Sequence, residues 1–337
     1  MNGNIKAIFC ESPHHIAMRD AAMPVRREGE VLLRIARVGI CGTDYHIYEG
    51  LHPFLEYPRV MGHELSGLVM EADAASHLTT SQLVVVNPYI ACGTCHACVN
   101  GKPNCCMKIQ VLGVHRDGGM CEFLVVPEKN LLPADGLSAD AAACVEFLAI
   151  GAHAVRRSGM KSGQRVLVIG AGPIGLGVAL FAQIAEADVT IMDVHEGRLA
   201  LASAISGISS TILAGESVNS AMDQNGFDVV FDATGNRQSM ENSFRFVSHG
   251  GTYVLVGLVK DNITFFDPDF HKREMTLMAS RNATKQDFEH VIFAIKTNRI
   301  KISKLITHRT RLSDVVTNLP NWAKNKDGLI KAMIELD

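Results

Sequence analysis

One six-residue stretch constrains the fold more than any other part of the chain: Gly170-Ala171-Gly172-Pro173-Ile174-Gly175. It matches the pattern G-x-G-x-x-G, follows an apolar run and opens a segment with helical character. In that setting the first glycine allows a tight turn, the second lets a pyrophosphate approach the backbone, and the third lets the helix pack closely on the strand. The stretch therefore predicts a strand, a turn and a helix whose N-terminus binds a dinucleotide.

Alternating strand and helix patterns surround this motif. We expect strands at 166–169, 189–192, 228–232, 252–256 and 275–279, and helices at 173–185, 196–205 and 238–247. That alternation predicts a parallel sheet with helices on both faces. The first 150 residues carry mostly strand patterns, and a later helix is expected near 286–296. Because 337 residues exceed what one hydrophobic core usually organises, two domains are expected.

A carboxylate ends the second strand of this pattern. Asp193 lies 18 residues after Gly175, where it can accept hydrogen bonds from the ribose hydroxyls of adenosine and would repel a 2′-phosphate. NAD is therefore favoured over NADP, although Arg198 nearby weakens that preference. Ligands of such sheets bind at the carboxyl ends of the strands. Further cofactor contacts are expected at Thr234, Gly257, Leu258 and Arg281.

The most specific spacing in the chain belongs to four cysteines, Cys92, Cys95, Cys98 and Cys106. Four thiolates this close together, in a loop with Gly, Asn and Pro, can close a tetrahedral zinc site. No coordination position stays open, so the predicted site is structural. Cys105 is an alternative fourth ligand. Ordinary buried cysteines or an iron–sulfur cluster are competing interpretations, which the compact loop without core periodicity makes less favourable.

A second group of metal-binding side chains lies between residues 39 and 64 and continues at residue 146. Zinc accepts the ligand types of Cys41, His63, Glu64 and Glu146, and three protein ligands plus water are typical of a catalytic site. A nearby hydroxyl and imidazole could carry a proton from an alcohol to solvent, and a carboxylate could orient a zinc-bound histidine. These three residues are Thr43, His46 and Asp44. From spacing alone, a core thiol with a surface histidine is the competing interpretation.

Composition and charge exclude several classes of function. Charged residues make up 20% and hydrophobic residues 47% of the chain, as in a globular protein with a core. The net charge is −3 and Lys and Arg are not clustered, so no nucleic-acid partner is expected. The uncharged run 166–185 is better explained as a buried strand, turn and helix than as a membrane span. Without an apolar N-terminal signal, the nine cysteines are expected to be thiols or metal ligands in a reducing cytoplasm.

Taken in order, segments 39–44 and 62–64, the four cysteines and the glycine motif resemble the medium-chain, zinc-dependent alcohol dehydrogenase superfamily. The resemblance covers nearly the whole chain and implies an α/β protein. Residues 1–148 and 284–337 would form a β-rich GroES-like catalytic domain with a structural-zinc lobe at 88–108. Residues 149–283 would form an NAD-binding Rossmann domain with a doubly wound parallel sheet. A catalytic zinc ion, a structural zinc ion and NAD are the implied cofactors.

Glu64 together with Glu146 resembles the polyol (sorbitol) dehydrogenase branch, in which a Cys–His–Glu shell holds zinc and a second glutamate binds directly or through water. The branch usually has proline where this chain has Phe147, which could change how Glu146 reaches the metal. Four segments further resemble the bacterial hexonate 5-dehydrogenases, the group of the L-galactonate and L-gulonate 5-dehydrogenases and the RspB-like proteins. They are 111–119, 270–274, 280–284 and 307–309. This resemblance implies oxidation of the C5 hydroxyl of a six-carbon sugar acid to a keto-uronate.

A sugar acid needs a cation for its carboxylate, and a guanidinium binds a carboxylate through two hydrogen bonds. The candidates are His115, Arg116, Lys272 and Arg281, each of which could also be an ordinary surface charge. A neutral polyol (sorbitol-type) or L-threonine dehydrogenase is the alternative enzyme. A zinc- and dinucleotide-binding regulator without turnover is the alternative from another class. The implied partner is a small molecule, and the superfamily implies a homodimer or homotetramer.

Overall fold

The computed structural model describes residues 3–52, 55–215 and 225–336. The chain folds into two compact units. One contains Met1–Glu146 and Thr284–Asp337, and the other contains Phe147–Ala283. We call them the catalytic unit and the dinucleotide unit. The division expected from the sequence lay two residues later, between 148 and 149, with the same return at residue 284.

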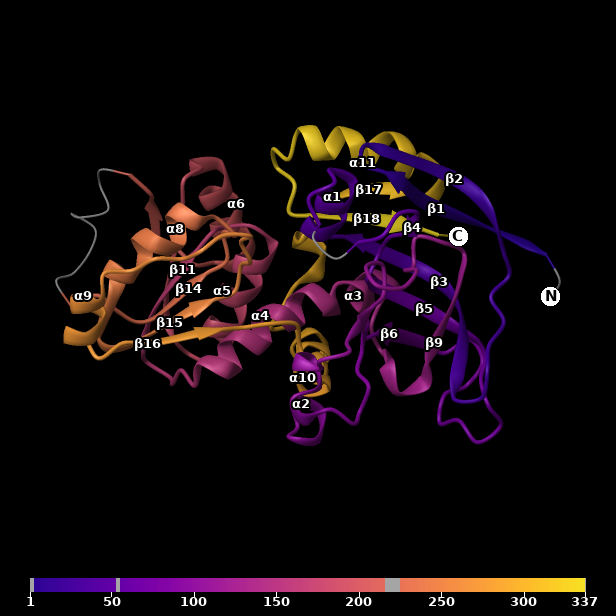
Figure 1. The fold of residues 1–337 in the computed structure, drawn as a ribbon, viewed down its shortest axis with the longest axis horizontal. Coiled ribbons are helices and arrows are strands. Elements are labelled where there is room, and N and C mark those ends of the chain that lie inside the picture. Colours follow the sequence, from indigo (N-terminus) through magenta and orange to yellow (C-terminus); the bar gives the residue numbers. More distant parts are fainter. Residues whose placement is uncertain (1–2, 53–54, 216–224, 337) are drawn as a thin grey trace. The chain divides into compact units, whose positions relative to one another are not determined.

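The dinucleotide unit is built on a six-stranded sheet in the order β13-β12-β11-β14-β15-β16, and every neighbouring pair of strands is parallel. The strands are rich in β-branched residues and mostly buried, as expected for a parallel sheet covered on both faces. Figure 1 shows them in magenta to orange. Their bounds are β11 Arg165–Ile169, β12 Asp188–Asp193, β13 Thr211–Leu213, β14 Phe227–Asp232, β15 Val247–Leu255 and β16 Thr276–Ala279.

Helices connect these strands as the alternating pattern predicted. Helix α5 contacts β11, β12 and β14, whereas the 3₁₀-helix η3 contacts β14 and β15. Aromatic and aliphatic side chains such as Leu167, Val230 and Tyr253 form the core between the sheet and its helices. The helices are α4 Val145–Ser158, α5 Pro173–Ile184, α6 Glu196–Ser206, α8 Arg237–Asn242, η3 Ser243–Phe246 and α9 Asp267–Lys272.

One expected helix differs in the structure. The helix predicted at 238–247 is split into α8 and η3, and strand β15 begins at Val247 instead of residue 252. The hydroxyl of Ser243 donates to the carbonyl of Ser239, four residues earlier. Such side-chain bonds to the preceding turn compete with regular helix geometry, which accounts for the change of helix type at Ser243.

The catalytic unit is mostly β, as predicted. Its largest sheet has the order β10-β6-β5-β3-β18-β17, with β9 also paired to β3. A second sheet has the order β2-β1-β4, and β7 pairs with β8. The strands are β1 Asn4–Ser12, β2 His15–Ala22, β3 Glu30–Ile40, β4 Arg59–Val60, β5 Glu64–Glu71, β6 Leu83–Val86, β7 Tyr89–Ile90, β8 Gln110–Val111, β9 Phe123–Pro127, β10 Leu131–Pro133, β17 Ile306–Arg311 and β18 Lys331–Glu335.

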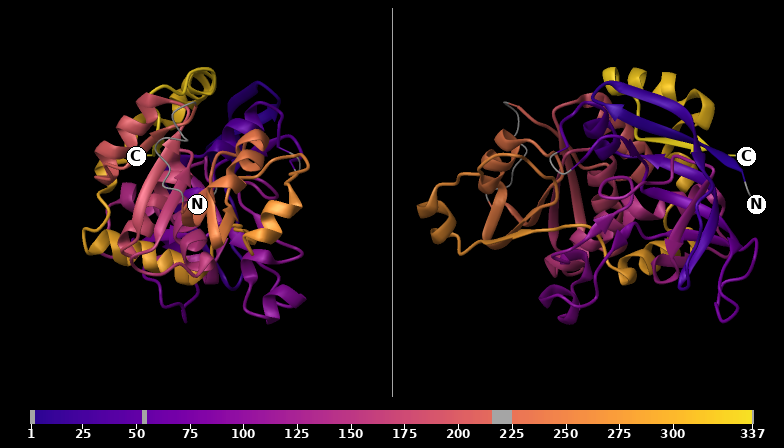
Figure 2. Two further views of the ribbon diagram at one scale, coloured as in Figure 1. Left: turned by 90° about the vertical axis from the view of Figure 1, so that its left-hand side faces the viewer. Right: turned by 45° about the vertical axis from the view of Figure 1, so that its right-hand side comes forward.

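The last segment of the chain completes the catalytic unit. Strand β18 pairs antiparallel with β3, with Ala332 opposite Ile40. Helix α11 contacts β2 and β17, and Figure 2 shows this helix in yellow beside the indigo N-terminal strands. The helices of this unit are α1 Gly42–Tyr48, α2 His96–Val99, η1 Pro103–Cys105, η2 Glu128–Asn130, α3 Ala139–Ala143, α10 Lys285–Lys296, η4 Ile302–Lys304, η5 Leu312–Asp314 and α11 Val315–Lys324.

Together these elements form a β-rich unit and a unit with a parallel sheet and connecting helices, the two-part α/β architecture that the sequence predicted. Among the described residues, no helix combines the length and the apolar character needed to cross a membrane.

Candidate active site

Two neighbouring strands of the large sheet bring the first metal-binding group together. Cys41 follows the end of β3 and caps α1, while His63 and Glu64 lie where β5 begins. Antiparallel pairing of β3 with β5 places Gly39 opposite Glu64. As a result, one ligand atom from each of Cys41, His63 and Glu64 lies within 4.8 Å of the other two. The structure thus gathers three of the four predicted ligands of the catalytic zinc.

Asp44 ties the two ligand segments to each other. Its Oδ2 accepts a hydrogen bond from the amide of Cys41 at 2.8 Å, and its Oδ1 accepts one from the amide of Gly62 at 3.2 Å. The same Oδ1 lies 4.0 Å from Nδ1 of His63. Burial raises the pKa of Asp44, while His63 and the two amides oppose that shift. The carboxylate therefore holds the backbone of both ligand segments, while its distance to the imidazole is too long for the hydrogen bond by which the sequence predicted Asp44 to orient the histidine.

Glu64 is bound by a lysine from the far end of the chain. Nζ of Lys331 lies 2.6 Å from both carboxylate oxygens of Glu64 and 3.3 Å from the carbonyl oxygen of Ile40. Burial alone would lower the pKa of Lys331, but Glu64 raises it above the ordinary value, so the ammonium group stays protonated. A Cβ on Gly39 would lie 2.1 Å from Oε2 of Glu64, so only glycine leaves room for this carboxylate.

Glu146 reaches the same region from the start of α4, and its carboxylate accepts a hydrogen bond from the hydroxyl of Tyr89. Burial raises the pKa of Glu146 to about 7, while His63 lowers it. A bound cation would favour the ionised carboxylate. Glu146 lies near His63 but is not part of the group formed by Cys41, His63 and Glu64.

The residues fit a zinc ion. A thiol, an imidazole and a carboxylate converge, and Nδ1 of His63 is buried without a hydrogen-bond partner among the described residues. Such a donor set is typical of catalytic zinc. Thr43 lies in the first turn of α1, where its hydroxyl is 3.8 Å from Sγ of Cys41, and His46 is exposed one turn later. The two residues predicted to relay a proton are thus on the helix that Cys41 caps.

The four cysteines form a second group. Cys95 Sγ lies 3.5 Å from Cys98 Sγ and 3.9 Å from Cys106 Sγ, and the four sulfurs lie within 4.8 Å of one another. It is Cys106 that joins Cys92, Cys95 and Cys98, whereas Cys105 is exposed.

Backbone amides surround these sulfurs and favour thiolates. The amide of Cys92 donates to Cys106 Sγ at 3.3 Å, and that of Cys95 donates to Cys92 Sγ at 3.4 Å. Backbone hydrogen bonds lower the pKa of Cys92 to about 6, whereas burial raises that of Cys98 to about 12 in the absence of metal. Thiolates are the form that binds metal, so four sulfurs in this arrangement fit a closed structural zinc site.

The glycine motif has the geometry that the sequence predicted. Gly172 caps α5, and Pro173 is its first residue. A Cβ on Gly175 would lie 1.7 Å from the carbonyl oxygen of Gly170, so only glycine allows the helix to approach this turn. Asp193 ends β12, where its Oδ2 accepts from the amide of Ala171 at 2.8 Å. The carboxylate that was predicted to bind ribose therefore also fixes the phosphate-binding turn.

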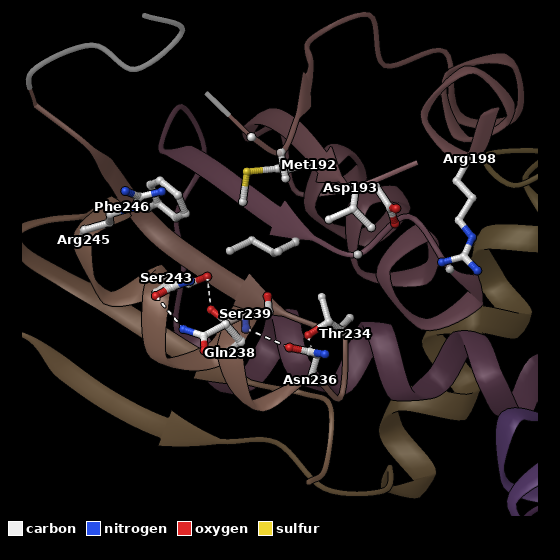
Figure 3. Close-up of a pocket in the computed structure, with 18 residues that line it drawn as sticks. Met192, Asp193, Arg198, Thr234, Asn236, Gln238, Ser239, Ser243, Arg245 and Phe246 are labelled. Atoms are coloured by element: carbon white, nitrogen blue, oxygen red, sulfur yellow. Dashed lines mark hydrogen bonds between the residues drawn. The ribbon is translucent and has the colours of Figure 1, made fainter. Parts of the chain in front are cut away.

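A cavity of about 650 Å³ lies beside this turn at the carboxyl ends of β11, β12 and β14. Figure 3 shows Asp193 and Arg198 at one end of it and Arg245 with Phe246 at the other. Buried Asp232 accepts from the hydroxyls of Thr234 at 2.6 Å and Ser239 at 2.8 Å, which shapes the wall between these ends. This cavity has the size and position of an adenosine site in a Rossmann sheet.

Other predicted cofactor residues also follow strand ends. The amide of Gly257 donates to the carbonyl of Asp232 at 2.9 Å, and Leu258 beside it is exposed. Ser280 donates its amide to Leu255, which places Arg281 just past the carboxyl end of β16. Lys272 lies elsewhere: it ends α9, and its neighbour Arg273 binds the carbonyl of Val247 at the amino end of β15. The structure does not bring Lys272 together with the glycine motif.

The two predicted substrate residues of the catalytic unit lie in a turn beside the metal ligands. The amide of Gly113 donates to the carbonyl of Arg116 at 2.8 Å, and the amide of Gly119 donates to Gly62 at 2.9 Å. His115 accepts through Nδ1 from the amide of Val111 at 3.1 Å, whereas Arg116 is exposed. This turn thus packs against the residue that precedes His63.

Sequence reasoning missed Lys331 and Tyr89. A signal existed for the first, because a lone lysine interrupts the apolar run 329–334 and lysine is rarely buried without a partner. Tyr89 had only its place between a buried strand and the cysteine lobe. Neither pattern identifies the glutamate that the residue binds.

Comparison with known proteins agrees with this architecture. Residues 27–136 match the model of the alcohol dehydrogenase GroES-like domain, and residues 173–297 match that of the zinc-binding dehydrogenase. The chain is 41% identical to L-galactonate-5-dehydrogenase of Escherichia coli K12 over 98% of both chains.

Solved structures agree as well. A putative zinc-binding dehydrogenase from Sinorhizobium meliloti 1021, bound to NADP, has a TM-score of 0.91 and 28% identity and covers 99% of this chain and 100% of its own. The rspB alcohol dehydrogenase of Escherichia coli CFT073, in complex with NADH, has a TM-score of 0.92 and 27% identity over 99% of both chains. The resemblance inferred from the motifs is confirmed, and the chain belongs to the zinc-binding, medium-chain alcohol dehydrogenase family, as an oxidoreductase that acts on CH–OH groups with zinc and a nicotinamide dinucleotide.

Proposed function

We propose that this protein oxidises the C5 hydroxyl of a hexonate, such as L-galactonate or L-gulonate, to a keto-uronate with NAD. The observation that carries the proposal is the 41% identity to L-galactonate-5-dehydrogenase over nearly the whole of both chains. The pairing of Glu64 with Glu146, which resembles polyol dehydrogenases, supports a polyhydroxylated substrate.

Zinc bound at Cys41 and His63 would act as a Lewis acid that lowers the pKa of the substrate hydroxyl. Thr43 would accept the hydroxyl proton while its own proton passes by way of the cofactor ribose to exposed His46, on the same helix, and from there to solvent. A bound nicotinamide ring would accept the hydride that leaves the substrate carbon. Buried Asp44 keeps the imidazole of His63 in place throughout, because it holds both ligand segments.

A cation must recognise the carboxylate of a sugar acid. Arg116 is the favoured residue of the catalytic unit, because it is exposed in the turn that packs against Gly62. Its guanidinium can form two hydrogen bonds with a carboxylate. Arg281, past the carboxyl end of β16, is the candidate of the dinucleotide unit. Lys272, at the amino end of the sheet, is the weakest of the four predicted contacts.

A substrate panel tests the proposal. The purified protein is given NAD with L-galactonate, L-gulonate, sorbitol or L-threonine, and NADH formation is followed by absorbance. We expect the highest kcat/KM with a hexonate. A preference for sorbitol or L-threonine would establish the neutral polyol or threonine enzyme instead, and no turnover with any substrate would favour a zinc- and dinucleotide-binding regulator. The Arg116→Ala and Arg281→Ala variants are tested with the same substrates. If a variant keeps the preference of the parent protein for hexonate over sorbitol, the replaced arginine does not bind the carboxylate.

NAD rather than NADP is the proposed coenzyme, because the Asp193 carboxylate at the ribose end of the cavity would repel a 2′-phosphate. Arg198 at the same end works against this preference. The same panel with NADP measures the ratio directly, and a kcat/KM with NADP equal to that with NAD would contradict the assignment. We further propose a cytoplasmic homo-oligomer. Nine cysteines without disulfides fit a reducing compartment, and sedimentation of the intact protein determines its subunit number.

A further inference from the structure

The two buried glutamates of the metal site have different partners. Both oxygens of Glu64 lie 2.6 Å from the ammonium of Lys331, whose positive charge offsets that of the carboxylate. Glu146 instead accepts from the phenol of Tyr89, a neutral donor. Its bonded atom is Oε1, and Oε2 accepts no hydrogen bond from the residues that the structure describes. Glu146 therefore has no cationic hydrogen-bond partner among the described residues, and its Oε2 is open to a cation.

Tyr89 is itself held firmly. Its amide donates to Oδ1 of Asn87 at 3.0 Å, and its carbonyl accepts from Nδ2 of Asn130 at 3.1 Å. Its ring meets that of buried Phe288 edge-on, with centroids 6.3 Å apart. Backbone and ring are both fixed, so the hydroxyl has little freedom to point elsewhere.

The position of Tyr89 in the chain links it to the four-cysteine lobe. Strands β7 and β8 pair at the base of the lobe, with Tyr89 opposite Val111. Cys92 follows three residues after Tyr89, and its amide donates to Sγ of Cys106. The closed lobe thus supports the strand from which Tyr89 reaches Glu146.

We propose that Tyr89 is a positioning residue for the catalytic metal site, which fixes Oε1 of Glu146 by hydrogen bonding and leaves Oε2 as the ligand atom. The inference rests on the proposed catalytic role of this site but not on the identity of the substrate. The phenol would constrain Glu146 in a chain where Phe147 stands at the position for which the resemblance to polyol dehydrogenases implies proline.

Metal binding by the Tyr89→Phe variant tests this role. The full-length protein is stripped of metal and titrated with Co²⁺, whose visible bands differ between a four-thiolate site and a mixed site. We expect about tenfold weaker Co²⁺ binding and altered bands at the mixed site, as for other residues that orient metal ligands. The four-cysteine site should be unchanged and is an internal control. Unchanged affinity and bands at the mixed site would overturn the proposal.

Tyr253→Phe is the matched control, because the buried hydroxyl of Tyr253 donates to the carbonyl of Met240 in the dinucleotide unit. It should leave both cobalt sites as in the parent protein. A second variant, Asn130→Ala, loosens the backbone of Tyr89 and should weaken only the mixed site. If Asn130→Ala and Tyr89→Phe both leave that site unchanged, the lobe and the phenol have no role in it.

A double-variant cycle separates positioning from a general structural effect. If Tyr89 acts through Glu146, then Tyr89→Phe should not weaken Co²⁺ binding further once Glu146 is replaced by Ala. Additive losses would show that Tyr89 acts by another route and would overturn the proposal. Because Co²⁺ binding needs no substrate, a negative substrate panel with a positive cycle would refute only the proposed function.

Discussion

Lys331 forms a buried ion pair with Glu64, one of the predicted ligands of the catalytic zinc ion. Its side chain is 1% exposed, and both oxygens of Glu64 hold its ammonium group in the core of the catalytic unit. The desolvation cost of two buried ions is offset only while both are present. Either residue alone would leave an uncompensated charge among apolar strands.

We therefore expect the Lys331→Met variant to lose about 3 to 5 kcal/mol of unfolding free energy in the metal-free protein. Urea denaturation of both proteins measures the difference. Replacing both partners, as in Glu64→Leu with Lys331→Met, should recover much of the loss because no charge stays buried. Lys285→Met, at an exposed position on α10, is the control and should change little. Equal stability of Lys331→Met and the parent would refute this account of the pair.

Gly175 allows a second prediction at this scale. Its Cβ would lie 1.7 Å from the carbonyl oxygen of Gly170, so Gly175→Ala must displace the phosphate-binding turn. We expect NADH binding, measured by fluorescence titration, to weaken by about 1 to 3 kcal/mol, the usual cost of overpacking. Gly197→Ala is the matched control, because this other helical glycine has open space around it. Equal NADH affinity of the two variants would contradict the steric argument.

At the scale of elements, a chain of charges ties four segments of the catalytic unit. Asp140 in α3 accepts from Arg37 of β3 at 2.9 Å and from Arg309 of β17 at 2.5 Å, and Arg309 also donates to Glu335 of β18 at 2.6 Å. Helix α3 leads directly to Cys144 and then to α4, which carries Glu146. The network thus fixes the entry to α4 against the central sheet.

This network makes stability depend on pH. Partial burial alone would raise the pKa of Asp140, but Arg309 and Arg37 hold it below its ordinary value of 3.8. The ionised carboxylate therefore stabilises the fold above pH 3.8, and that contribution is lost as the pH falls through the lower folded-state pKa. Asp140→Asn should cost on the order of 1 kcal/mol at pH 7 and progressively less in acid.

Thermal unfolding of both proteins from about pH 2 to about pH 7, a range that brackets the ordinary carboxylate pKa, checks this expectation. Asp20→Asn is the control, because Asp20 and its partner Lys6 are both more than half exposed. Its effect should be small at every pH. If the stability difference between Asp140→Asn and the parent protein stayed constant in acid, the charge of the carboxylate would not be the cause of the stabilisation.

At the scale of the whole molecule, the catalytic unit needs both ends of the chain, since β18 brings Lys331 to a site whose ligands lie near its beginning. Both metal groups belong to this unit. We expect about two zinc ions per chain by elemental analysis, one in a closed site and one in an open site. The Cys41→Ser variant should lose one zinc ion together with turnover.

Cys95→Ser is the companion variant and should lose the other zinc ion. Structural zinc contributes directly to folding free energy, so Cys95→Ser should also melt at a lower temperature than Cys41→Ser. A Cys41→Ser variant that kept both zinc ions and full turnover would exclude the proposed catalytic site. The assay separates the two sites because each cysteine belongs to only one group.

The sequence by itself determined the features that short spacing encodes. The glycine motif specifies a turn between a strand and a helix, because a Cβ on Gly175 would meet the carbonyl oxygen of Gly170 in the same motif. The four cysteines specify a closed metal loop because they lie close together in the sequence. The residue types of Cys41, His63 and Glu64 indicate a second metal site. The alternating pattern of residues 165–280 was enough for the parallel sheet and its helices.

Only the tertiary structure decided which buried charges and donors face these groups. Lys331 is 267 residues from Glu64, and Tyr89 is 57 residues from Glu146. Their contacts depend on the pairing of β18 with β3 and of β7 with β8, and a shift of one residue would turn each side chain to the other face. Strand register arises from the packing of the whole unit, so local spacing could name the metal ligands but not the residues that hold them in place.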